Sequence, residues 1–105
     1  MDTLTIYQRV LQTVEYFLKN AAHLTINELK DFDPSIEELA KNLRTLATIL
    51  GSLASSGYDD EDMAINALQC CLELEKLAQI VQDEQEDELE ELFLRLEMHV
   101  KAPIK

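Results

Sequence analysis

Apolar residues recur at alternating spacings of three and four along most of this chain, which constrains its fold more than any other feature. Such spacing places side chains on one face of an α-helix. The first stripe comprises Leu4, Tyr7, Leu11, Val14, Leu18 and Ala21. Ile6, Val10 and Phe17 widen it, so this helix is expected to touch two neighbours. Only two glycines and two prolines occur in 105 residues, which leaves few natural turns.

Two capping boxes mark the next helix starts. Thr25, with Glu28 three residues later, predicts a short helix that ends near residue 32. Ser35 and Glu38 repeat this pattern and predict the start of a longer helix. Pro34 is expected in the first turn of that helix, where a proline is well tolerated.

Two long helices are predicted after these caps. The first runs to about residue 55, is capped by Gly57, and carries the stripe Ile36, Leu39, Leu43, Leu46, Leu50 and Leu53. The second is capped by Asp59 and carries the stripe Met63, Ala67, Cys70, Leu74, Leu77 and Val81, with Ile65, Leu68 and Leu72 on its opposite side. A helix that is apolar on two faces is usually central in its bundle, so we expect this one to be the most buried. A partner-binding role for one stripe is the alternative.

Residues 82–88 contain no apolar side chain and interrupt this pattern. The apolar repeat also slips there, because Val81 and Leu89 are eight residues apart where a heptad repeat requires seven. We therefore predict a helix break near Gln82–Gln85 and a fifth helix after it. A single helix over residues 60–100 is the alternative.

The last apolar segment, residues 92–100, alternates at period two as a strand does. The chain offers no second strand to pair with it, so we assign it to a helix. Leu89, Phe93 and Leu96 then share one face, and Leu94 and Met98 lie on the far side.

The predicted fold is all-α, a compact bundle of four to five helices. It forms a single domain over residues 1–105, with a frayed tail at residues 102–105. Because 47% of the residues are apolar, the chain can build a core. No apolar run is long enough for a membrane span and no secretory signal is visible, so a cytoplasmic location is expected.

The side chains that most often carry chemistry are scarce. Cys70 and Cys71 are neighbours on a helix, pointing about 100° apart, so we interpret them as small core residues rather than a disulfide. His23 and His99 have no metal-like spacing to other ligands. The acidic runs lack the glycine and alternating ligands of a calcium loop. We predict no enzyme, no cofactor and no metal site.

Charge is the remaining signal. The chain has 21 acidic and 9 basic residues, a net charge of −12. Residues 58–105 contribute −10 of it, with 14 acids and 4 bases. Direct binding to nucleic acid or to an anionic membrane is therefore not expected, because phosphates would be repelled.

The acids gather in two clusters. One is Asp59, Asp60, Glu61 and Asp62, and the other is Asp83, Glu84, Glu86, Asp87, Glu88, Glu90 and Glu91. They are interpreted as a docking surface for a basic protein, held by a small apolar patch around Leu94 and Met98. The alternative is that they only keep the protein soluble and complement helix dipoles.

In size, charge and helicity the chain resembles small acidic inhibitors: anti-CRISPR and anti-restriction proteins, nuclease immunity proteins and nucleic-acid mimics. The resemblance rests on these bulk properties and implies a non-catalytic inhibitor of a basic, nucleic-acid-binding protein. The alternative is a structural module or chaperone that self-associates, as a homodimer for example, or binds a partner helix through Ile65, Leu68 and Leu72. The sequence further predicts that Leu68→Asp and Leu74→Asp both unfold the domain.

Overall fold

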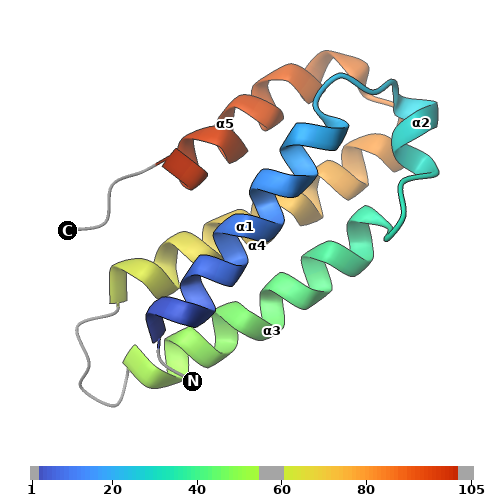
Figure 1. Ribbon diagram of the computed structural model, residues 1–105. Helices are drawn as coiled ribbons and strands as arrows, with labels where there is room; N and C mark the ends of the chain where they lie inside the picture. Colours follow the sequence, from blue (N-terminus) through green and yellow to red (C-terminus); the bar gives the residue numbers. More distant parts are fainter. Residues whose placement is uncertain (1–2, 55–60, 102–105) are drawn as a thin grey trace.

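The computed structural model is a bundle of four long helices with a short helix at one end (Figure 1). The structure describes residues 3–54 and 61–101. Over these residues there is no strand, so the all-α prediction is confirmed, including the helical assignment of residues 92–100. The elements are α1 (Thr3–Ala21), α2 (Ile26–Lys30), α3 (Ile36–Ala54), α4 (Glu61–Gln82), the 3₁₀ turn η1 (Glu86–Glu88) and α5 (Leu89–Lys101).

The long helices alternate in direction along the chain. α1 and α4 run one way, α3 and α5 run the other, and α2 crosses one end of the bundle between α1 and α3 (Figure 1). α4 packs against α1, α2, α3 and α5, most extensively against α3. α4 thus contacts every other described α-helix of the bundle. None of the described helices combines the length and the apolar composition that crossing a membrane requires.

The capping predictions are confirmed at α2 and largely at α3. The Glu28 backbone N–H donates to Oγ1 of Thr25 at 3.3 Å, and the Thr25 N–H donates back to Oε1 of Glu28 at 3.1 Å. This second bond holds the pKa of Glu28 below its ordinary value. At α3 the Glu38 N–H donates to Oγ of Ser35 at 3.2 Å. Pro34 precedes this cap, so its predicted place in the first helical turn is wrong.

The buried face of α1 differs from the predicted stripe. Val10, Val14 and Phe17 have no exposed surface, whereas Leu4 is 51% exposed. α1 packs against α3, α4 and α5. Its buried face is therefore centred between the predicted stripe and the three residues that widen it. The residues that appeared only to widen the stripe form one half of the buried face, and Tyr7, Val14 and Ala21 form the other half.

Only one of the two apolar stripes on α4 is buried. Ile65, Leu68 and Leu72 are 48%, 41% and 48% exposed. The expectation that α4 is buried on both faces is therefore wrong. Each of these side chains keeps roughly half of its surface exposed, and Ile65 and Leu68 border α3 near Ala47 and Thr48. The covered side is broader than predicted, because it also includes Asn66, Cys71 and Ile80.

The predicted helix break is confirmed, and the single helix over residues 60–100 is wrong. After α4 the chain reverses at Glu84, whose φ of 55° is a backbone conformation more typical of glycine. The N–H of Gln85 donates to the Ile80 carbonyl at 3.0 Å, and that of Glu84 donates to the Val81 carbonyl at 3.2 Å. These two bonds form a Schellman motif, which ends α4 and turns the chain toward α5.

A buried amide sets the register of three helices. Nδ2 of Asn66 on α4 donates to the Tyr7 hydroxyl on α1 at 2.6 Å and to the His99 carbonyl on α5 at 2.9 Å. Burial raises the pKa of Tyr7. Further along, Nε of Arg95 on α5 lies 3.2 Å from Oε2 of Glu73 on α4. These contacts hold α4 and α5 antiparallel at a defined register.

The predicted caps Gly57 and Asp59 and the predicted frayed tail at residues 102–105 lie outside the described residues.

Candidate binding surfaces

The larger acidic cluster spans the turn between α4 and α5 and the first turn of α5, at the end of the bundle where α2 lies (Figure 1). We call residues 83–91 the acidic connection. All seven of its carboxylates are exposed: Asp83, Glu84, Glu86, Asp87, Glu88, Glu90 and Glu91. The segment forms no continuous helix, because the chain reverses at Glu84 and passes through η1 before α5 begins.

The carboxylates of the acidic connection fall into two groups. Glu84 pairs with Lys30 at 3.1 Å, Glu91 pairs with Arg95 at 3.6 Å, and Asp83 accepts a hydrogen bond from a side-chain amide at 3.0 Å. These three therefore have partners within the protein. The others have no ion pair with any described residue, and they are Glu86, Asp87, Glu88 and Glu90.

The smaller acidic cluster lies at the opposite end of α4. Glu61 and Asp62 are exposed in the first helical turn, where carboxylates complement the helix dipole. Asp59 and Asp60, which the sequence adds to this cluster, lie outside the described residues. α4 has 22 residues and a length of roughly 33 Å, so the two clusters do not form one surface.

A groove between α1 and α5 lies next to the acidic connection. Its volume is about 610 Å³. Its apolar lining comes from both helices and the segment after α1: Leu18, Ala22, Leu24, Leu89, Phe93, Leu94 and Val100. Its charged lining comprises Glu15, Lys19, Glu86, Glu90, Glu97 and Lys101. The groove joins unpaired carboxylates of the acidic connection to an apolar surface.

Leu94 and Met98 are 55% and 69% exposed, on the outer face of α5 as the sequence predicts. Leu94 lies in the lining of the α1–α5 groove together with Glu90, whereas Met98 does not. The structure therefore brings one of the two residues to the acidic connection. The pairing of α1 with α5 was not apparent from the sequence, because periodicity shows one helix face at a time.

The exposed stripe of α4 borders a second hollow, shared with α3. Ile65 and Leu68 line it opposite Ala47 and Thr48. Glu61 of the smaller acidic cluster lies at the same place. This face is therefore a second apolar surface with a carboxylate nearby, although it carries less charge than the groove.

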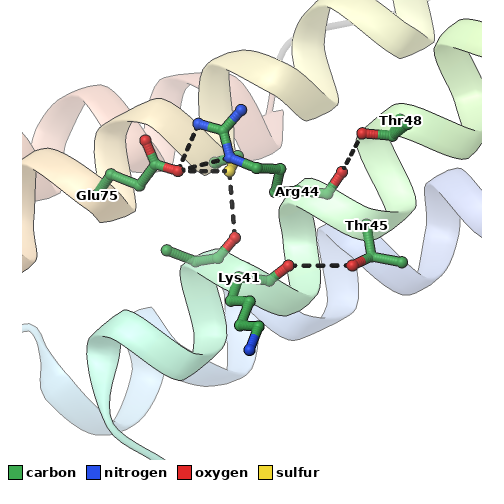
Figure 2. Close-up of polar contacts among 7 residues, drawn as sticks. Lys41, Arg44, Thr45, Thr48 and Glu75 are labelled. Atoms are coloured by element: carbon green, nitrogen blue, oxygen red, sulfur yellow. Dashed lines mark hydrogen bonds and ion pairs between the residues drawn. The ribbon is translucent and has the colours of Figure 1, made fainter.

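A polar cluster joins α3 to α4 farther along their interface. Figure 2 shows Arg44 and Glu75 pointing toward each other from the two helices. Nε of Arg44 donates to Oε1 of Glu75 at 2.9 Å, and this bond raises the pKa of Arg44. The Cys71 thiol donates to the Ala40 carbonyl at 3.2 Å. Each of these polar groups thus has a hydrogen-bond partner on the other helix, and the cluster joins α3 to α4 by non-covalent contacts.

Both cysteines are free and buried, as the sequence predicts for small core residues. Burial raises the pKa of the Cys70 thiol to about 12 and that of Cys71 to about 11. The thiolate is the reactive form of cysteine, so both side chains are poor nucleophiles at neutral pH.

We expect neither thiol to react with a thiol reagent at pH 8 while the protein is folded, and both to react rapidly in denaturant. Because the folded pKa of each thiol exceeds the unfolded value of about 8.5, their contribution to stability is constant below that pH. It is lost progressively as the pH rises toward 11 and 12. Labelling rates and alkaline unfolding curves measure both effects. Rapid labelling of native protein would contradict the burial described above.

The chain has two histidines, His23 and His99. His23 is exposed, and the contact described for His99 is made by its backbone carbonyl. Across residues 3–54 and 61–101, no group of His, Cys, Asp and Glu side chains is placed to hold a metal ion.

No known protein family matches the chain, and neither a curated protein nor a solved structure is significantly similar to it.

Proposed function

We propose that the protein is a non-catalytic binding module that docks on a basic protein through the acidic connection and the adjoining α1–α5 groove. The observation that carries this proposal is the position of Glu86 and Glu90. Both are exposed, neither has an ion pair with a described residue, and both line an apolar groove. A surface that combines these two properties suits a partner with cationic and apolar side chains.

The two properties contribute differently to binding. Charge complementarity speeds the encounter of the proteins and selects among partners, while buried apolar contacts slow dissociation. The described residues from 61 to 101 include 12 acids and 3 bases, so the field of this half is strongly negative. Proteins that bind nucleic acid present cationic surfaces, so inhibition of such a protein by nucleic-acid mimicry is the form of the function that the charge favours.

Neutralising the acidic connection is expected to slow association with the partner. The variant replaces the four unpaired carboxylates and leaves Glu84 and Glu91 in their ion pairs: Glu86→Gln, Asp87→Asn, Glu88→Gln and Glu90→Gln. The partner is first captured from host lysate at low salt, identified and purified. Association rates are then measured over a salt series. We expect a loss of about tenfold or more at low salt, which added salt reproduces in the unmutated protein.

A control variant makes the same charge change outside the groove: Asp31→Asn, Asp33→Asn, Glu37→Gln and Glu38→Gln. All four positions are exposed, and Glu38→Gln leaves the Glu38 backbone N–H that donates to Ser35 in place. The control is expected to retain most of the association rate. Equal loss in both variants would indicate a general charge effect without a docking surface. Unchanged binding in the first variant would mean that the acids only keep the protein soluble.

A second candidate function is a structural module that self-associates or binds a partner helix through the exposed α4 stripe. The exposure of Ile65, Leu68 and Leu72 favours it. Salt separates the candidates, because two copies with a net charge of −12 repel each other. Self-association should therefore strengthen with salt, whereas binding of a basic partner should weaken. Sedimentation of the unmutated protein and of Leu68→Asp over a salt series distinguishes them.

A further inference from the structure

We infer that the α1–α5 groove binds an amphipathic helix of the partner, with lysine or arginine residues flanking an apolar stripe. This inference rests on the proposed function and specifies the chemistry of the partner. Of the two apolar surfaces described above, the groove has the richer acidic lining. It also adjoins the acidic connection.

The shape of the groove suits a helix. Its lining extends from Glu86 in η1 along α5 to Lys101, and a helix of 13 residues such as α5 is about 20 Å long. Two antiparallel helices with an apolar channel between them present the surface on which an amphipathic helix lays its apolar face. An occupant with apolar residues at positions i, i+3, i+4 and i+7 would contact Leu18 and Phe93 along one side.

The charged residues that line the groove determine which sign of charge a bound segment should carry. Lys101 is paired with Glu97, so these two charges offset each other. Glu15, Glu86 and Glu90 have no ion pair with a described residue, and Lys19 is the remaining cation of the lining. The lining is therefore acidic overall, which favours cationic flanks. A second copy of this chain is a poor occupant, because each copy has a net charge of −12.

The floor of the groove is already formed in the protein without its partner. Phe93 stacks on Phe17 with ring centroids 6.2 Å apart, and Phe17 meets Phe32 edge to face at 5.2 Å. These contacts hold the Phe93 ring against the core. Little rearrangement is then required when a helix binds, which lowers the entropic cost of association.

The test uses a synthetic peptide of about 14 residues, which spans roughly 21 Å as a helix. It carries leucines on one face and lysines beside them. One control peptide has the same composition in an order that disperses the leucines, and another replaces lysine with glutamate. Binding is measured by fluorescence anisotropy, and the site is mapped from amide shifts in NMR spectra. We expect shifts at α1 and α5, and binding of each control weaker by about tenfold or more, which is about 1.4 kcal/mol.

Two matched variants place the site. Leu94→Lys puts a cation into the groove lining, and Leu68→Lys makes the same change on the exposed face of α4. We expect Leu94→Lys to weaken peptide binding by about tenfold or more and Leu68→Lys to leave it within about twofold. The shift map of the unmutated protein provides the same test if either variant folds poorly.

Three outcomes would overturn the inference. If Leu68→Lys alone abolishes binding, the helix docks on α4. If the dispersed peptide binds as well as the amphipathic one, attraction is by charge alone. If no helical peptide binds while the purified partner still binds with steep salt dependence, the proposed function holds and the helical occupant is wrong. If the unmutated protein binds no helical peptide and its binding to the purified partner does not depend on salt, the proposed function is rejected as well.

Discussion

Leu74→Asp is expected to unfold the protein. Leu74 lies on the covered side of α4 with no exposed surface. Truncating a buried leucine to alanine already costs about 2–5 kcal/mol, and a carboxylate at the same place is also desolvated without a partner. Since small domains have a total stability of about 5–15 kcal/mol, this loss is enough to abolish folding or leave a residual, non-cooperative transition. Far-ultraviolet circular dichroism during thermal unfolding measures it.

Leu72→Asp is the matched control for that change. It introduces the same side chain two residues away, at a position that is 48% exposed. We expect a cost of no more than about 1 kcal/mol, mainly from the lower helix propensity of aspartate. Leu68→Asp should behave in the same way, which reverses the expectation from sequence that it unfolds the domain. If either exposed variant unfolds like Leu74→Asp, this face of α4 is covered in solution.

Asn66→Ala is expected to lower the free energy of unfolding by about 1–3 kcal/mol. The substitution removes two hydrogen bonds and leaves the Tyr7 hydroxyl and the His99 carbonyl without this donor. Both groups lie where α1, α4 and α5 meet, so water does not readily replace the amide. Urea unfolding at a fixed pH measures the change. Gln69→Ala, at an exposed position of the same helix, is the control and should cost less than about 0.5 kcal/mol.

A double-mutant cycle isolates the contact between Asn66 and Tyr7. Tyr7→Phe removes only the hydroxyl and keeps the buried ring. Because the two groups are 2.6 Å apart, the effects of Asn66→Ala and Tyr7→Phe should not add, with a coupling energy of about 0.5–3 kcal/mol. Strict additivity would show that the hydrogen bond does not form in solution.

Local interactions made much of the fold predictable. The capping box at Thr25 and Glu28 acts within four residues, and the helix stripes follow from the fixed angular step between residues. The break after Gln82 was also predictable, since two turns without apolar side chains cannot contribute to a core. The exposure of the carboxylates in residues 83–91 follows from the same cause, because unpaired charges are costly to bury.

The sequence by itself determined which segments are helical, where most of the described ones begin and end, and that the charge is concentrated in residues 58–105. Only the tertiary structure decided which apolar stripe of α4 is covered. Both stripes have the periodicity of a buried face, and their exposure depends on where α1, α3 and α5 pack. The α1–α5 groove was decided in the same way, since Leu18 and Phe93 are brought into one lining by packing between helices far apart in the sequence. Periodicity constrains each helix separately, whereas a binding surface is formed by the relative placement of several helices.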